Sequence, residues 1–371
     1  MSNPKLAPKL SSVAQTLNQL KSTGSLSVLS DNELGARLQG ISVPAKADAV
    51  FEGGGVKGIA LTGAIMVAES LGVQWQRVAG TSAGAITACL LAAGFTGKEL
   101  VPVLTREMDF NEFMDEGLLD KIPLFGKLAS AIFEKGIYEG DYFEDWMTRK
   151  LAEKNVHTFA DVMDENGESR LKLIASDVTR REMIVLPDDL PRYGLNPAEF
   201  SVARAARMSM SIPYFFEPVE LSVKTPYMVG EKKKRARRKC FVVDGGLLSN
   251  YPLWLFDTDG HVEPRWPTYG FKLLEPDSDK PSPSKWPHQF IMSLVATMLD
   301  AHDKAYIDRA NFDRTIGIPT MGIQTTQFDL SDEDKVLLLR AGQEAAVQFF
   351  KGWDFAAHNR EYRAVSTGDD A

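Results

Sequence analysis

Cysteine is scarce in this sequence: Cys89 and Cys240 are its only two, which is too few for a disulfide framework. Such scarcity fits a reducing compartment. No run of about 18 apolar residues occurs, so we expect no transmembrane helix. The first residues lack the apolar h-region of a Sec signal peptide. We therefore expect a cytoplasmic protein, while export by a signal-free route stays open.

Patterns of metal ligands are also missing. No pair of the five histidines has a spacing such as H-x-x-x-H, and the two cysteines are isolated. We therefore expect no zinc site and no other metal site. In other respects the composition is that of a globular protein, since 44% of the residues are hydrophobic and 25% are charged. These fractions exclude a collagen-like chain, a coiled-coil rod and a wholly disordered protein.

Charge is distributed unevenly along the chain. The 42 basic and 50 acidic residues give a net charge of −8. Residues 231–239 read E-K-K-K-R-A-R-R-K, with seven bases and one acid, so this basic tract carries +6 and the rest of the chain −14. Nucleic-acid-binding proteins usually spread their bases over a whole face. We therefore expect no nucleic-acid partner and interpret the tract as a local device or a solvated loop.

Two units of strand, glycine turn and helix follow one another at residues 47–71 and 73–94. Such units indicate a parallel sheet in an α/β protein. No convincing linker divides the chain, so we predict one domain with a three-layer α/β/α fold and a mostly parallel central sheet. Other apolar patterns predict strands at 170–176, 183–186, 240–246, 266–274 and 314–320, a loop at 276–287, and helices at 201–210, 286–310 and 332–350.

The two ends of the chain flank a main domain that we place at residues 48–355. Residues 1–47 are a polar extension, and residues 356–371 a C-terminal tail. Apolar residues of the extension recur at helical spacing and predict a short amphipathic helix: Leu10, Val13, Leu17 and Leu20. Asp31 is positioned to cap a second short helix. The extension either lies on the main domain or acts as a lid, partner or targeting segment.

A serine between two glycines is the strongest chemical signal. Gly80-x-Ser82-x-Gly84 follows an apolar strand pattern and precedes a helix of small residues. A sharp strand-to-helix turn of this kind exposes the Ser82 hydroxyl at the helix N-terminus, where the helix dipole favours a developing anion. The competing interpretation is a glycine turn in which the serine only caps the helix.

The glycine loop at residues 53–58 is the second signal. It matches G-x-G-x-x-G, but the dinucleotide fingerprint also needs an acidic residue at the end of the next strand, and V-Q-W-Q-R-V-A-G has none. It is not a Walker A loop, because Lys57 is followed by Gly58 and not by Ser or Thr. The remaining interpretation is an oxyanion hole of backbone donors held near the serine.

Asp244 ends the apolar strand F-V-V and precedes two glycines. We expect its carboxylate to leave the sheet at the same C-terminal strand edge as Ser82, where sites form in open α/β sheets. An Asp before two glycines can also be only a turn residue. A triad in the order Ser, Asp, His would need His261, which lies in a hydrophilic loop and is interpreted as a surface residue.

Three segments, in this order, resemble the bacterial patatin-like phospholipase family. They are E-G-G-G-V-K-G at 52–58, G-T-S-A-G at 80–84 and D-G-G at 244–246. Supporting stretches at 173–179 and 203–219 and near the C-terminus are also similar, although Met208–Met210 departs from the family pattern. The resemblance covers roughly residues 48–352. It implies a lipid acyl hydrolase acting on phospholipids or other acyl lipids, without a cofactor or Ca²⁺.

The resemblance also implies roles for individual residues. Ser82 would be the nucleophile and Asp244 the general base acting on it directly, so burial must raise the basicity of the aspartate. Gly80 and Gly84 would form the nucleophile elbow. The oxyanion hole would come from the glycine loop: Gly53, Gly54, Gly55, Lys57 and Gly58. A thioesterase or acyltransferase using the same dyad and a non-catalytic lipid-binding protein are the alternatives. Lipid head group, positional preference, activator and oligomeric state stay open.

The basic tract lies between the 203–219 segment and the Asp244 strand. It is interpreted as an unstructured surface loop, as a membrane-surface anchor, or as a nuclear-import or nucleic-acid patch. Each base near an anionic leaflet adds about 1 kcal/mol, so a tract of charge +6 could recruit a lipase to a membrane. The tract is close in sequence to the candidate active site, and this position favours membrane docking over the last interpretation. The candidate membrane contacts are Lys232, Lys233, Lys234, Arg235, Arg237, Arg238 and Lys239. For Arg204 and Arg207, a salt bridge on a helix surface is favoured over a contact with an anionic head group.

Overall fold

The structure is a computed structural model of the 371-residue chain. It describes residues 6–108, 140–213, 215–229, 232–258, 263–274, 309–325, 327 and 329–363. The predicted loop at 276–287 and nearly all of the predicted helix at 286–310 lie outside the described residues. No helix within these ranges is long and apolar enough to cross a membrane.

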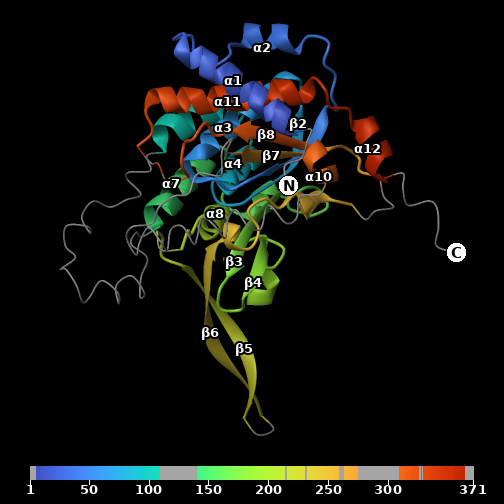
Figure 1. The fold of residues 1–371 in the computed structure, drawn as a ribbon. Coiled ribbons are helices and arrows are strands. Elements are labelled where there is room, and N and C mark those ends of the chain that lie inside the picture. The colour runs from blue at the N-terminus through green and yellow to red at the C-terminus, as the bar shows by residue number, and fades with distance from the viewer. Residues whose placement is uncertain are drawn as a thin grey trace, which may run out of the picture.

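A mixed sheet forms the centre of the molecule (Figure 1). Its strand order is β5-β6-β3-β2-β1-β7-β8, and β4 pairs with β3 off this path. Pairing is parallel from β8 through β7, β1 and β2 to β3, and antiparallel among β3, β4, β5 and β6. The strands are β1 (Lys46–Phe51), β2 (Gln74–Gly80), β3 (Leu171–Asp177), β4 (Glu182–Leu186), β5 (Val219–Val229), β6 (Lys232–Asp244), β7 (Thr268–Leu274) and β8 (Thr315–Pro319).

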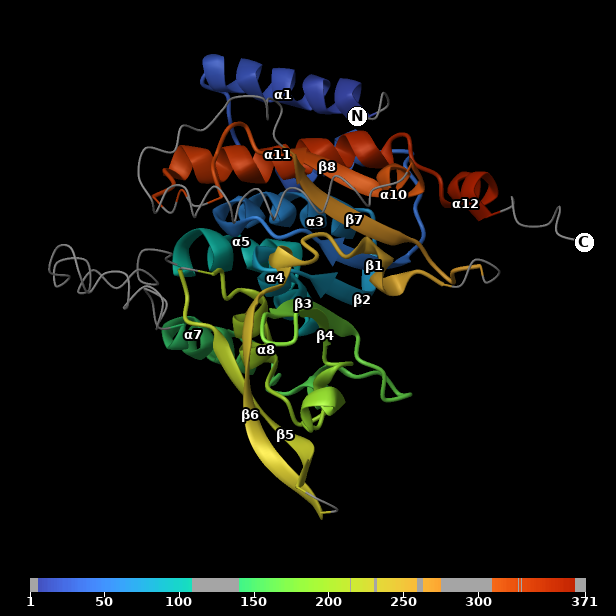
Figure 2. The ribbon, with the colours of Figure 1, turned by 60° about the horizontal axis from the view of Figure 1, so that its bottom comes forward.

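Helices flank this sheet and, with its mostly parallel strands, confirm the predicted fold class (Figure 2). The long helix α11 packs on α3, and α1 lies outside α11 (Figures 1 and 2). The helices are α1 (Leu6–Ser22), α2 (Asp31–Leu38), α3 (Ile59–Ser70), α4 (Ala83–Ala92), α5 (Gly97–Pro102), α7 (Asp141–Ala152), α8 (Val202–Ser209), α10 (Arg309–Asp313), α11 (Asp332–Phe350) and α12 (Phe355–Arg363).

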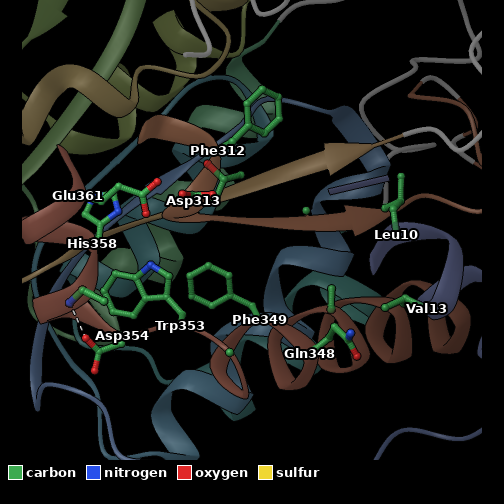
Figure 3. Close-up of a pocket in the computed structure, with 15 residues that line it drawn as sticks. Leu10, Val13, Phe312, Asp313, Gln348, Phe349, Trp353, Asp354, His358 and Glu361 are labelled. Carbon is green, nitrogen blue, oxygen red and sulfur yellow. Dashed lines mark hydrogen bonds between the residues drawn. The ribbon is translucent and has the colours of Figure 1, made fainter. Parts of the chain in front are cut away.

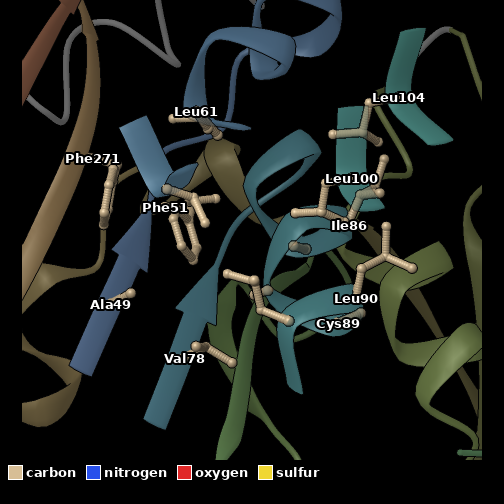
Figure 4. Packing of buried hydrophobic residues seen from close by; sticks show 14 of the residues in the cluster. Ala49, Phe51, Leu61, Val78, Ile86, Cys89, Leu90, Leu100, Leu104 and Phe271 are labelled. Carbon is tan, nitrogen blue, oxygen red and sulfur yellow. The ribbon is translucent and has the colours of Figure 1, made fainter. Parts of the chain in front are cut away.

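Side chains that alternate along β1 and β2 divide the core into two parts. Phe51 and Val78 belong to the large cluster, which includes Ile86 and Leu90 of α4 (Figure 4). Residues of the opposite parity, such as Val50 of β1, belong to a small second cluster with the segment 251–256. Because successive side chains of a strand point to opposite faces, these short apolar runs are buried on both sides. The sheet edge that carries the glycine turns is therefore held on a rigid support.

The N-terminal extension packs against the body of the protein. Leu17 of α1 is fully buried, and Val13 is nearly so. The cap of α2 differs from the prediction: Ser30 accepts the Glu33 N–H, while Asp31 is the first helical residue. The serine satisfies this free N–H from the position just outside the helix, and the Glu33 side chain completes a capping box.

The interpretation of the basic tract as a loop is wrong. Residues Lys232–Lys239 are the first part of β6, which pairs with β5 from Val219↔Val242 to Val229↔Lys232. The two strands form a hairpin that extends away from the helices in both views (Figures 1 and 2). Antiparallel pairing satisfies the backbone N–H and C=O groups whatever the side-chain charge, so a run of bases can form a strand.

Candidate active site

Ser82 lies at a sharp turn between β2 and α4. Its backbone has φ 54° and ψ −124°, in a region that non-glycine residues rarely adopt. The turn leaves no room around it, because a Cβ atom at Gly80 would lie 2.2 Å from the Gly84 carbonyl oxygen. A Cβ at Gly84 would lie 2.3 Å from the Phe51 carbonyl oxygen of β1. The strand, the serine and the helix can therefore pack in this way only with glycine at both positions.

A second serine holds the turn in place. The Ser82 N–H donates to Ser209 Oγ (3.1 Å), and Ser209 Oγ donates to the carbonyl oxygen of Ile174 on β3 (2.6 Å). Ser209 is the last residue of α8 and is fully buried. The sequence analysis did not single it out as a site residue. Its only signal was a small polar residue between two methionines in an otherwise apolar helix end.

The pairing register places Asp244 level with Ser82. Gly80 of β2 pairs with Leu173 of β3, and Ala175, two residues further, pairs with Asp244 of β6. Ser82 is likewise two residues beyond Gly80. The prediction brought these two residues to one edge for the wrong reason: β6 runs antiparallel to β3, so Asp244 enters the sheet from that edge instead of leaving through it.

The Asp244 carboxylate is almost completely enclosed, with 1% of the residue exposed. One oxygen, Oδ1, accepts the Gly246 N–H at 2.7 Å, whereas Oδ2 is buried without a hydrogen-bond partner among the described residues. Burial raises the pKa of Asp244 to about 7, against the lowering effect of the Ser82 hydroxyl and the Gly246 N–H. A carboxylate in this condition can accept a proton near neutral pH.

The glycine loop lies directly against the serine turn. A Cβ at Gly53 would lie 3.0 Å from Ser82 Cβ, and one at Gly58 would lie 3.2 Å from Ala83 Cβ. The loop enters the turn Gly55–Gly58 through Gly55, whose φ is +55°. This close approach and the positive φ account for the glycines without any nucleotide.

Only part of the predicted donor set is free. The Gly53 N–H donates to the Asn250 carbonyl oxygen (3.1 Å), and the Lys57 N–H donates to the Gly54 carbonyl oxygen (3.2 Å). The N–H groups of Gly54 and Gly55 have no acceptor among the residues that the structure describes. The N–H groups of Gly53 and Lys57 are therefore engaged within the protein, whereas those of Gly54 and Gly55 are available as donors.

Ala83 supplies a donor that the sequence analysis missed. It is the first residue of α4, and within the described ranges its N–H has no acceptor. The residue after the serine of such an elbow characteristically contributes to an oxyanion hole, so the G-x-S-x-G pattern itself could have identified it. With the helix dipole behind it, this N–H favours negative charge beside Ser82.

A buried ion pair fixes the base of the glycine loop. Lys272 of β7 donates to Glu52 Oε1, and Glu52 Oε2 accepts the Leu273 N–H at 2.5 Å. A Cβ at Gly54 would lie 2.3 Å from Leu273 Cδ1, so the loop rests on this strand. A lysine in an apolar strand was the only sequence signal for the pair, whose members lie 220 residues apart.

The arginines of α8 differ from each other. Arg204 forms an ion pair with Glu144 (3.5 Å), as favoured from the sequence. Arg207 contradicts the same expectation, because it is buried and donates to Ser211 Oγ and to the Glu217 carbonyl oxygen (2.8 Å). Burial lowers the pKa of Arg207 to about 10. Its hydrogen bonds connect the end of α8 to the segment that leads into β5.

The histidines contribute nothing to this arrangement within the described ranges. His157 is exposed, and His358 lies on α12, while His261, His288 and His302 are outside those ranges. In the described parts of the chain, no group of three or more His, Cys, Asp or Glu side chains could hold a metal ion. The residues brought together are therefore a serine, a carboxylate and backbone donors, which suit acyl transfer.

A cavity of about 360 Å³ lies elsewhere, between α1, α11 and α12 (Figure 3). Phe349 and Trp353 line it together with Leu10 and Val13 of α1. None of the residues around Ser82 or Asp244 borders it. It belongs to the packing of the two chain ends and not to the serine site.

Comparison with known proteins identifies the family from the sequence. The family model described as patatin-like phospholipase matches residues 49–257. The protein YqhO of Bacillus subtilis (strain 168) is 40% identical over 310 residues, which cover 83% of this chain and 99% of that protein. Among solved structures, VipD from Legionella pneumophila is similar with 17% identity and a TM-score of 0.46, covering 84% of this chain and 67% of that chain. The ExoU–SpcU complex from Pseudomonas aeruginosa is similar with 18% identity and a TM-score of 0.47, and the match covers 84% of this chain and 52% of that chain.

Proposed function

Because this chain belongs to the patatin-like phospholipase family, we propose that it is a serine-dependent lipid acyl hydrolase of the phospholipase A or lysophospholipase type. The observation that carries the proposal is the pairing of a serine in a strained turn, 6% exposed, with a carboxylate that is 1% exposed. Asp244 lies level with Ser82, and its Oδ2 has no hydrogen-bond partner among the described residues. Family membership supports the general chemistry of lipid ester hydrolysis.

In the acylation step, Ser82 Oγ attacks the acyl carbonyl carbon of the lipid. The hydroxyl proton moves to the Asp244 carboxylate, and the carbonyl oxygen becomes a tetrahedral oxyanion. The N–H groups of Gly54, Gly55 and Ala83 stabilise that charge; one such donor typically contributes a factor of about 100–1,000 in rate. When the intermediate collapses, the ester bond breaks and Asp244 returns the proton to the leaving alcohol.

In the deacylation step, water attacks the acyl-serine ester. Asp244 accepts the water proton, the same donors hold the second oxyanion, and the proton returns to Ser82 Oγ as the fatty acid leaves. Both steps require an ionised Asp244. Since burial raises its pKa to about 7, the base is strong enough to assist the serine but is ionised only in neutral and alkaline solution.

A fluorophosphonate probe with fatty-acid release from mixed phospholipid vesicles tests the proposal. We expect wild type to be labelled and to release fatty acid, whereas Ser82→Ala and Asp244→Asn should do neither. Labelling on a serine other than Ser82 would remove the proposed nucleophile. Absence of both labelling and release in wild type, even after addition of a cell extract that could supply an activator, would favour a non-catalytic lipid-binding protein.

A further inference from the structure

The hairpin of β5 and β6, which we call the basic arm, grows out of the same sheet edge as the candidate active site. The last pair that joins β6 to β3 on this side is Asp177↔Val242. From there to Lys232, β6 pairs only with β5, and ten extended residues span roughly 30 Å. Ser82 follows β2, which is parallel to β3, so the arm and the serine turn share one edge.

The root of the basic arm has one buried and one exposed side. Val219, Leu221 and Val223 of β5 are buried, while Glu220 and Ser222 between them are exposed. By the pairing register, Lys239 lies opposite Ser222 and Phe241 opposite Glu220, and both are exposed as well. Because alternate strand positions share a side, Arg237 lies on the same side as Lys239 and Phe241, and its side chain is exposed too. The exposed side of the described part of the arm therefore carries two bases, Arg237 and Lys239, next to Phe241.

Of the three bases of the arm whose side chains the structure describes, two have no acidic partner within the described residues. Arg237, Arg238 and Lys239 are all exposed. Lys239 pairs with Glu220 at 2.7 Å, a contact in which both side chains are about half exposed. Among the described residues, the other two have no ion-pair partner. Their charge is therefore available to an external anion.

An exposed apolar pair lies at the root of the arm, between the bases and the sheet. Phe241 is 40% exposed and Val178 43% exposed. The Val178 N–H donates to the Phe241 carbonyl oxygen (3.0 Å), so Val178, the first residue after β3, lies beside Phe241 of β6. Large apolar side chains of this exposure are few in the described structure, and two of the four lie here.

We propose that the exposed side of the basic arm docks on an anionic lipid bilayer, with Phe241 and Val178 entering the interfacial region beside it. This rests on the proposed function in one respect, namely that the substrate is a bilayer lipid. The combination of bases with an adjacent apolar pair favours a bilayer over a nucleic acid, because phosphate contacts alone leave Phe241 without a role. Docking in this way brings the sheet edge that carries Ser82 toward the lipid surface.

Sedimentation with vesicles tests the docking separately from catalysis. The full chain carrying Ser82→Ala is mixed with vesicles of phosphatidylcholine that contain about 30% anionic phosphatidylglycerol, or with vesicles of phosphatidylcholine alone. A second chain, with Ser82→Ala and the three further substitutions Arg237→Ser, Arg238→Ser and Lys239→Ser, is compared with it. Since each base contributes about 1 kcal/mol, we expect binding to the anionic vesicles to weaken about 100-fold.

A matched control removes the same charge elsewhere. Lys21, Lys351 and Arg360 are exposed. They belong to α1, to the end of α11 and to α12, and these helices lie away from the arm (Figure 1). Changing these three to Ser should leave vesicle binding within about twofold of the parent, because their distance from the surface exceeds the Debye length of about 10 Å. Phe241→Ser should weaken binding several-fold at constant charge.

Three results would overturn the docking proposal. They are equal binding by the arm and control variants, equal binding to the two vesicle compositions, and binding of a mixed-sequence oligonucleotide at least as tight as that of the anionic vesicles. Loss of binding by the unsubstituted arm in 0.5 M salt, a concentration at which the Debye length is only about 4 Å, gives a check that needs no variant. Arm-dependent vesicle binding without any fatty-acid release from wild type would contradict the proposed function and leave the docking proposal standing.

Discussion

The two ends of strand β6 follow different rules. Its last residues, Val242–Asp244, are buried and paired with β3, and the strand ends in the carboxylate beside Ser82. Its first eight residues pair only with β5 and include seven bases. At the inner end, close packing limits which side chains fit. At the outer end, exposed charge determines which ligands can bind. One strand thus joins a tightly packed site to a surface where substitutions are tolerated.

Near the site, small volume is a requirement. A single added methyl group would overlap backbone atoms that the sheet holds in place, as at Gly84 against Phe51 and at Gly245 against Ile174. On the arm, Arg237 and Arg238 contact solvent and have no ion-pair partner among the described residues. Substitutions at the inner end should therefore change stability and chemistry together, while those at the outer end should change neither.

The largest difference between the two ends should appear in catalysis. Asp244→Asn removes the proposed base and should lower the turnover of a soluble short-chain ester by at least about a thousand-fold. The triple arm variant at 237–239 should hydrolyse the same ester at the wild-type rate, because this substrate does not require docking. Steady-state kinetics on both variants checks this, and an Asp244→Asn enzyme with more than a tenth of the normal rate would contradict the proposed role.

The next largest effect concerns packing. Gly84→Ala places a Cβ 2.3 Å from the Phe51 carbonyl oxygen and should lower the free energy of unfolding by about 3 kcal/mol or more. Gly35→Ala is its control, because a Cβ there meets nothing within 4 Å in the middle of α2. A methyl group at that helical position should raise stability by about 0.5–1 kcal/mol. Urea denaturation of both variants measures the difference, and equal changes would contradict the packing account.

A smaller effect follows from ionising a buried carboxylate. The pKa of Asp244 is about 7 in the folded protein, against 3.8 without burial, so wild type loses stability as the pH rises between these values. Asp244→Asn has no such loss. The free energy of unfolding of the variant should therefore rise relative to that of wild type as the pH increases through this range. Above pH 7 the variant should be the more stable by more than about 1 kcal/mol. Thermal unfolding at pH 4.5 and pH 8 checks this; a stability gap that does not widen with pH would contradict it.

The smallest effect belongs to the outer end. Replacing Arg237, Arg238 and Lys239 by Ser should change the free energy of unfolding by less than about 0.5 kcal/mol, because the one ion pair lost is exposed. Urea denaturation beside wild type measures it. A loss of several kcal/mol would show that the bases hold the hairpin together and would end the contrast between the two ends of β6.

The sequence predicted those parts of the site that depend on short-range geometry. Two glycines around a serine, after a strand and before a helix, suffice to place Ser82, because the turn is built from adjacent residues. The strand that ends at Asp244 was predictable for the same reason, because its apolar residues are adjacent in the sequence. The direction of β6 was not predictable, because parallel or antiparallel pairing with β3 depends on residues distant in the chain.

Other features were hidden by long-range pairing. Lysine is depleted in strands and the tract has no apolar alternation, so the sequence favoured a loop where the structure has a strand paired with β5. The Glu52–Lys272 pair joins residues 220 apart, and neither residue alone predicts it. Ser209 acts through two hydrogen bonds that no local pattern encodes. Local turn chemistry was therefore predictable, while tertiary contacts were not.

The most direct test of the account is the pH dependence of fluorophosphonate labelling at Ser82. If Asp244 activates the serine, the labelling rate of wild type should rise as the pH increases and reach half of its maximum near pH 7, the pKa of the buried carboxylate. Asp244→Asn should show no rise across this range and a rate far below that of wild type. A wild-type rate that does not change between pH 5 and pH 9, or an equal rate in Asp244→Asn, would contradict the pairing of Ser82 with Asp244.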